Sequence, residues 1–103
     1  MKITAQTIFM EELQEMAEKM FGNLVKAVVD VEKGIMAVDA ELHADEEAYL
    51  IENGSKQKDL WGINLYPELT GDDFIEFDSM INLRPSQGNL TRGVENKDIQ
   101  EKI

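Results

Sequence analysis

Hydrophobic side chains recur along the chain at two different spacings, which separate expected helices from expected strands. Between residues 10 and 21 the apolar positions follow the three- and four-residue steps of one helix face: Leu13, Met16, Ala17, Met20 and Phe21. Gly22 follows this segment and can adopt the left-handed conformation that commonly ends a helix. The pattern therefore predicts a helix over residues 10–21.

From residue 24 to residue 42 the spacing changes to a two-residue alternation, which is typical of strands. Lys33-Gly34 lies in the middle of this segment, where a two-residue turn would fit. Such a turn pairs Val29 with Val38 across the two strands. We therefore predict a β-hairpin over residues 24–42.

Residues 60–84 alternate in the same way and are interrupted by a segment rich in turn-forming residues. The favoured pairing places Asn64 opposite Glu76 and Gly62 opposite Asp78. In this register Trp61 lies on the buried side, and we interpret it as a core residue. The pattern predicts a second hairpin over residues 60–84.

Two further helices complete the prediction. Acidic residues at the start of the 45–53 segment and Gly54 at its end favour a helix there, although residues 48–52 would also suit a strand. The last segment, 97–103, is predicted to be helical. Residues 1–103 are thus expected to form a single α+β domain, a four-stranded antiparallel sheet from two hairpins with helices on one side.

Charge and composition limit the classes of partner. The chain has 10 basic and 21 acidic residues, a formal net charge of −11, and no cysteine. Such a surface repels nucleic-acid phosphates and anionic lipids, so we expect neither duplex nucleic acid nor a membrane as partner. The N-terminus lacks the apolar core of a signal peptide, which predicts a cytoplasmic location. Two open sheet edges suggest a homo-oligomer.

One stretch, residues 79–94, differs in chemistry from the rest of the chain. It has no acidic residue and holds both arginines of the protein. Arginine grips carboxylate or phosphate groups through paired hydrogen bonds, and glycines let backbone amides approach a ligand. We therefore predict a loop at 84–93 that accepts a small anionic ligand. The candidate binding residues are Arg84, Ser86, Gln87, Asn89 and Arg92, with Asn82 and Asn64 beside them.

A purely structural interpretation of this loop is the alternative. Arg84 would then pair with Glu76 or Asp78, and the polar residues would satisfy the backbone of an ordinary loop. The chain has no glycine-rich phosphate or dinucleotide motif, and we predict no cofactor.

His43, the only histidine, is a second candidate for chemistry. Together with Asp45 or Asp78 it would suit acid–base catalysis, since a neighbouring carboxylate raises the pKa of an imidazole. The pair His43 and Asp45 would also supply two ligands to a divalent metal, with a third ligand from elsewhere. The alternative is that His43 simply begins the following helix.

Several segments together resemble a family of small uncharacterised prokaryotic proteins. The resemblance lies in residues 42–47, in residues 52–67 with their Leu60-Trp61-Gly62-Ile63 core, and in residues 76–89. It covers nearly the whole chain and implies a free-standing cytoplasmic protein, but it assigns no activity and no catalytic residue.

Three functional hypotheses follow. The first is a small soluble binding protein with an anion-accepting loop at 84–93. The second is a small hydrolase using His43 with Asp45 or Asp78, either alone or with the help of a metal ion. The third is a structural or protein-interaction module without a small-molecule site. Whether the protein is an enzyme is left open by the sequence.

Overall fold

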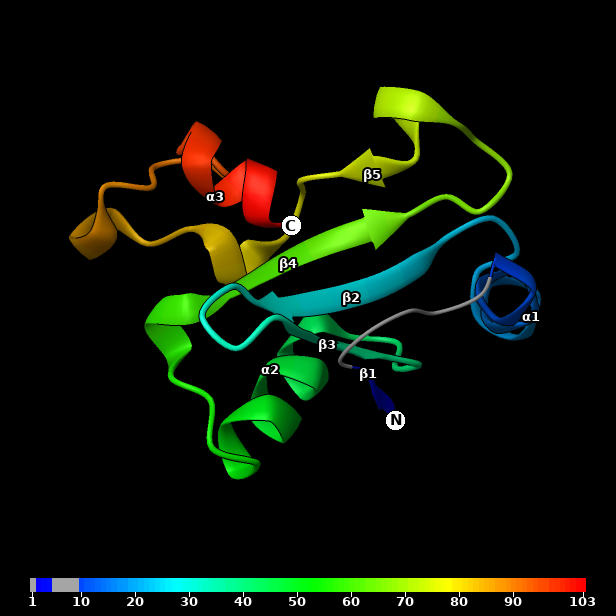
Figure 1. Ribbon diagram of the computed structural model, residues 1–103, viewed down its shortest axis with the longest axis horizontal. Coiled ribbons are helices and arrows are strands. Elements are labelled where there is room, and N and C mark those ends of the chain that lie inside the picture. The colour runs from blue at the N-terminus through cyan, green and yellow to red at the C-terminus, as the bar shows by residue number, and fades with distance from the viewer. Residues whose placement is uncertain (1, 5–9) are drawn as a thin grey trace.

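The computed structural model describes residues 2–4 and 10–103, which form an antiparallel sheet packed between helices (Figure 1). The strands are β1 (Lys2–Thr4), β2 (Val25–Asp30), β3 (Ile35–Val38), β4 (Leu60–Leu65) and β5 (Ile75–Glu76). The helices are α1 (Met10–Met20), α2 (His43–Glu52) and α3 (Lys97–Lys102). The predicted α+β class, with an antiparallel sheet and three helices, is confirmed.

The sheet has the order β1-β3-β2-β4-β5, so the two predicted hairpins lie side by side through β2 and β4. The edge strand β1 was not predicted, because a three-residue strand is too short to show a hydrophobic period. Residues 48–52 belong to α2, which settles the choice between helix and strand in favour of helix.

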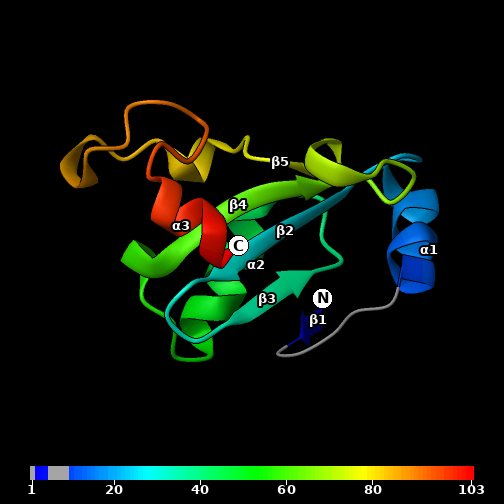
Figure 2. The same ribbon diagram turned by 45° about the horizontal axis from the view of Figure 1, so that its top comes forward.

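Helices cover both faces of the sheet, so the expectation of helices on one side is wrong (Figures 1 and 2). On one face Leu13 and Ala17 of α1 pack against the Val25 side of β2, and Ile103 at the end of α3 joins the same core. On the other face Leu50 of α2 packs against Val28. Helices are needed on both faces because the successive residues Val28 and Val29 of β2 point to opposite faces of the sheet and both are buried.

The first hairpin has a register two residues away from the predicted one. Val29 pairs with Met36 instead of Val38. The side chain of Asp30 accepts hydrogen bonds from the backbone N–H groups of Glu32 at 3.0 Å and Lys33 at 2.9 Å, which fixes a four-residue turn over 31–34. A shift of two residues leaves every side chain on its predicted face, so the alternation alone could not detect it.

The second hairpin is confirmed at Asn64–Glu76 and Leu65–Ile75. Beyond Glu76 the strand pairing stops, and Gly62 does not pair with a strand residue at Asp78 as predicted. The chain there continues through short 3₁₀ turns at Met80–Asn82 and Pro85–Gln87. This irregular segment holds most of the predicted site residues.

No helix within residues 2–4 and 10–103 is long and apolar enough to cross a membrane.

Candidate functional site

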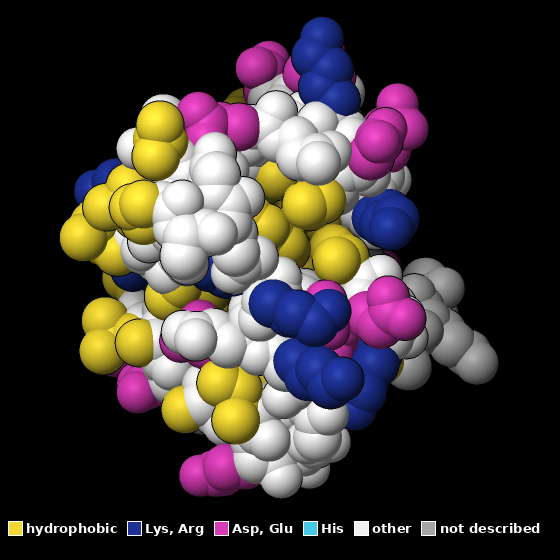
Figure 3. Space-filling view, turned by 90° about the vertical axis from the view of Figure 1, so that its left-hand side faces the viewer, with side chains coloured by type: hydrophobic (Ala, Val, Ile, Leu, Met, Phe, Trp, Pro, Cys, Tyr) yellow, Lys and Arg dark blue, Asp and Glu magenta, His cyan; other side chains and the backbone are white. Residues whose placement is uncertain are grey.

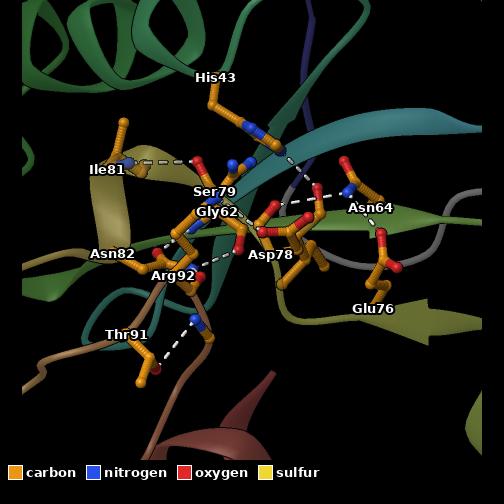
Figure 4. Close-up of polar contacts among 12 residues, drawn as sticks. His43, Gly62, Asn64, Glu76, Asp78, Ser79, Ile81, Asn82, Thr91 and Arg92 are labelled. Atoms are coloured by element: carbon orange, nitrogen blue, oxygen red, sulfur yellow. Dashed lines mark hydrogen bonds and ion pairs between the residues drawn. The ribbon is translucent and has the colours of Figure 1, made fainter.

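The side chain of Asn82 takes the place of a strand at the open edge of β4. Its Oδ1 accepts a hydrogen bond from the N–H of Gly62 at 2.8 Å, and its Nδ2 donates to the carbonyl of Gly62 at 2.9 Å (Figure 4). The same Nδ2 donates to the carbonyl of Arg92 at 2.9 Å. Because Asn82 is fully buried and these bonds are internal, its amide works within the fold. It ties the 79–93 segment to the sheet.

Only a glycine fits at residue 62, because Ser79 packs directly against its backbone. A Cβ atom at residue 62 would lie 2.6 Å from Cβ and 2.7 Å from Oγ of Ser79. The polar segment can therefore lie directly on β4 only because residue 62 has no side chain.

Arg84 is a structural residue in this geometry. It is 8% exposed, and its guanidinium donates to the backbone carbonyls of Ile81 and Gln57, each at 2.8 Å, and to that of Leu60. Its charged carbon also lies 4.6 Å from the ring centre of Trp61. Because backbone carbonyls occupy these donors, the guanidinium of Arg84 joins the 57–60 and 81–84 segments and is not available to bind a ligand.

Asn89 holds the far end of the same loop. It is buried, and its Nδ2 donates to the carbonyls of Asn82 at 2.7 Å, Gly93 at 2.8 Å and Thr91 at 3.0 Å, while its Oδ1 accepts from the N–H of Glu95 at 2.9 Å. The loop at 84–93 is therefore fixed by its own buried side chains before any ligand arrives.

A cavity of about 300 Å³ lies between this loop and α3. Trp61 of β4 lines it together with residues of the loop and of the start of α3: Gln87, Gly88, Asn89, Glu95, Asn96 and Ile99. Trp61 is 3% exposed, as expected for a core residue, yet its Nε1–H has no hydrogen-bond acceptor among residues 2–4 and 10–103. A buried donor without an acceptor costs about 1–3 kcal/mol, so this site favours a guest that accepts a hydrogen bond.

The remaining predicted residues gather elsewhere, on the α2 face of the sheet. Asn64 donates from Nδ2 to the carboxylate of Glu76 at 2.9 Å, and Arg92 forms an ion pair with Asp78 at 2.9 Å (Figure 4). His43 reaches from the start of α2 toward these groups. The Oδ1 atom of Asn64, in a side chain that is 7% exposed overall, is buried and has no donor in the described part of the chain.

The surroundings of His43 favour its neutral form. Its Nε2 donates to the carbonyl of Ile63 at 2.7 Å, which leaves Nδ1 as the acceptor of the uncharged ring. Burial lowers the pKa of His43 below its usual value, and the charges of Lys26 and Arg92 act in the same direction. The Ile63 carbonyl and Asp78 oppose this shift but do not reverse it.

The structure thus divides the predicted ligand site into parts. Arg84, Asn82 and Asn89 serve the fold, whereas Gln87 and Asn89 also line the cavity beside Trp61. Arg92 joins His43, Asn64 and Asp78 instead. Ser86 is exposed on the surface of the loop.

The other histidine partner, Asp45, lies in the first turn of α2. Among the described residues there is no group of three or more His, Cys, Asp or Glu side chains that could hold a metal ion. His43 and Asp45 therefore have no third ligand in residues 2–4 and 10–103.

Glu46 is a polar residue whose burial the sequence did not indicate. Its exposed fraction is 0%, and neither carboxyl oxygen has a hydrogen-bond partner in the part of the chain described. Burial raises its pKa to about 9, against weaker opposing effects of the Ala40 backbone and Lys26. In sequence it is one of several first-turn acids, and nothing distinguishes it from its neighbours.

Comparison with known proteins gives a family without an assigned activity. The chain belongs to the family described as "Protein of unknown function (DUF5674)", whose model matches residues 2–103. No curated protein and no solved structure matches the chain.

Proposed function

We propose that this protein binds a small organic ligand carrying a carboxylate or carbonyl group in the cavity between the 84–93 loop and α3. The observation that carries the proposal is Trp61, a lining residue of this cavity whose buried indole N–H has no acceptor among the described residues. A ligand oxygen would accept that hydrogen bond after a small movement of the indole ring or of the lining that opens the N–H to the cavity.

The lining favours a ligand with at most one negative charge. Among the described residues no lysine or arginine lines the cavity, and Glu95 contributes a carboxylate whose Oε2 accepts a hydrogen bond from the N–H of Leu90 at 2.7 Å. Arg84 lies over the ring of Trp61, but its guanidinium already donates to backbone carbonyls and is not available to a ligand. A phosphate dianion would bring about two unmatched negative charges into this lining, whereas a carboxylate brings one and a neutral carbonyl group brings none.

The apolar part of the lining suits the body of such a ligand. The indole ring and Ile99 offer apolar surface, and Gly88 has no side chain to obstruct the opening. The loop needs little rearrangement, because the Asn89 and Arg84 hydrogen bonds already fix it. Binding to a preformed site avoids much of the entropy cost of ordering a loop.

The test is a thermal-shift screen of small carboxylates, amides and phosphates, with Trp61→Phe as the key variant. Phenylalanine keeps an aromatic ring but removes the N–H. A ligand at one hundred times its dissociation constant stabilises the folded protein by about 2.7 kcal/mol, which moves the midpoint of a domain of this size by roughly 10 °C. We expect a shift with a carboxylate or carbonyl compound that Trp61→Phe loses.

Arg92→Ala is the matched control, since Arg92 lies on the other face of the sheet and should leave the shift unchanged. Each shift is measured against the same variant without ligand, which removes differences in basal stability. A panel without any shift, or an equal shift in Trp61→Phe, would overturn the proposal.

A second function rests on the neighbourhood of His43. A neutral imidazole beside the Asp78–Arg92 ion pair would be suited to proton transfer in a small hydrolase. In that case His43→Gln would abolish turnover of an ester or phosphoester substrate and keep the fold. Ligand binding at Trp61 would be unaffected.

Three further expectations belong to the same account: prokaryotic origin, a cytoplasmic location and assembly into a homo-oligomer. Support for assembly comes from Met80, Leu83 and Leu90, which expose 63%, 43% and 66% of their surface on one irregular segment. Sedimentation of Leu90→Ser beside the wild type would test it. If the variant and the wild type sediment with the same molecular mass, this segment is not the interface.

A further inference from the structure

A separate cavity of about 310 Å³ lies where the 31–34 turn meets the segment that follows α2. Its lining includes three of the eight lysines of the chain, Lys33, Lys56 and Lys58, together with Gly54, Glu32 and Asp59. Figure 3 views this end of the molecule and shows basic side chains gathered beside acidic ones. Such a concentration of ammonium groups is unusual on a chain with a net charge of −11.

Buried hydrogen bonds fix the frame that carries these lysines. Asp30 is 1% exposed, and its Oδ1 accepts from the N–H of Lys33 at 2.9 Å while its Oδ2 accepts from the hydroxyl of Ser55 at 2.6 Å. The N–H of Val31 donates to the carbonyl of Asp59 at 3.0 Å. The turn and the 55–59 segment are therefore joined rigidly, and the lysines start from backbone positions that do not need to be ordered by a ligand.

The charges around this cavity are incompletely matched. Lys58 pairs with Asp59 at 3.2 Å, but Lys33 and Lys56 have no ion-pair partner among residues 2–4 and 10–103. Ammonium groups gathered around one cavity repel each other unless an anion lies between them. With three ammonium groups and the two carboxylates of Glu32 and Asp59, the lining carries a net charge of +1. An anion in the cavity would lie beside the ammonium groups of Lys33 and Lys56, which have no ion-pair partner among the described residues.

Gly54 brings the backbone close to one of these charges. Its φ is +101°, and a Cβ atom at this position would lie 3.1 Å from Nζ of Lys33. The glycine thus leaves space for the ammonium group at the wall of the cavity.

We propose that this cavity binds a phosphoryl group, either as inorganic phosphate or as the phosphate of a small metabolite. A phosphate carries close to two negative charges at neutral pH and has several strong acceptor oxygens, which suits two free ammonium groups with a third nearby. A monocarboxylate has fewer acceptor oxygens and a smaller charge, so it would engage the two ammonium groups less completely. The site shares no lining residue with the Trp61 cavity, whose described lining holds no lysine or arginine.

Isothermal titration calorimetry with inorganic phosphate tests this assignment, with acetate as the singly charged comparison. The variant is Lys33→Ala/Lys56→Ala, and the matched control is Lys19→Ala/Lys97→Ala, which removes the same net charge from exposed positions elsewhere. We expect phosphate to bind the wild type and the control, and the Lys33/Lys56 variant to lose about tenfold or more in affinity, equivalent to about 1.4 kcal/mol. Acetate should bind more weakly than phosphate.

Titration with a phosphorylated sugar or nucleoside separates the two sources of the group. Tighter binding than that of inorganic phosphate identifies a metabolite, and equal or weaker binding identifies the free anion. Either result supports the phosphoryl assignment. The assignment is overturned if the wild type binds no phosphate compound at millimolar concentration, or if both double variants bind equally. Trp61→Phe should leave phosphate binding intact, so failure here does not depend on the carboxylate proposal.

Discussion

Arg84 gives the sharpest test of how this fold is held together, and Arg84→Met is the perturbation of choice. Methionine keeps a long unbranched side chain against Trp61 but removes the guanidinium. The change removes the donor from the carbonyl of Leu60, which is buried, and from those of Gln57 and Ile81, which are partly buried. Burial raises the pKa of Glu47, and the change also removes the positive charge of Arg84 that partly opposes this shift.

The magnitude follows from the number of bonds lost. A hydrogen bond to a charged group contributes about 1.5–3 kcal/mol net, so the two bonds at 2.8 Å alone predict a loss of about 3–6 kcal/mol. That is a large part of the total stability of a small domain, which is typically about 5–15 kcal/mol. The midpoint of thermal unfolding should fall by more than about 12 °C.

The assay is urea denaturation followed by far-ultraviolet circular dichroism, with Arg92→Met as the matched control. Arg92 makes one ion pair with Asp78, and both side chains are about half exposed, 56% and 44%. Such a pair contributes less than about 1 kcal/mol and is screened by salt. If Arg84→Met also lowers the free energy of unfolding by less than about 1 kcal/mol, then Arg84 does not hold the 57–60 and 81–84 segments together as argued.

Two further predictions concern the sheet and the buried acid. Gly62→Ala forces a Cβ to within 2.6 Å of that of Ser79 and should cost about 1–3 kcal/mol; in a double-mutant cycle Ser79→Gly should recover part of this cost, and strict additivity would contradict the proposed clash. Glu46 keeps its proton in the folded protein up to about pH 9 but loses it near pH 4.5 when unfolded, so it makes stability fall as pH rises between these values. Glu46→Gln removes this titration and should gain stability relative to the wild type at pH 8 but not at pH 4, measured by urea denaturation; an equal difference at both pH values would contradict it.

Periodicity predicted the elements but not their exact partners. The apolar stripe of residues 10–21 and the alternation in both hairpins correspond to α1 and to β2–β5. The register of the first hairpin depends on the side-chain hydrogen bonds of Asp30, which no hydrophobic pattern records. The two-sided burial of β2 was present in its run of valines but was interpreted as one-sided alternation.

For the candidate site, too, the sequence indicated the segment but not the contacts that its residues make. The absence of acidic residues from 79–94 marked the segment that lies on β4 and borders the Trp61 cavity. Composition could not show that Arg84 is buried, because its acceptors come from Gln57 and Leu60, more than twenty residues away in sequence. Nor could it show that Trp61, predicted to be core, keeps an unpaired donor there. Both facts depend on tertiary contacts.

The most direct test of the binding site follows the indole N–H of Trp61 by NMR. Because the chain has one tryptophan, this group gives a single, unambiguous resonance in a ¹⁵N-labelled sample. The account predicts that the carboxylate or carbonyl compound selected by the thermal-shift screen moves this resonance downfield and slows its exchange with solvent, as expected for a donor that gains an acceptor. A resonance that stays unchanged while the same compound stabilises the protein would place the ligand elsewhere and contradict the account.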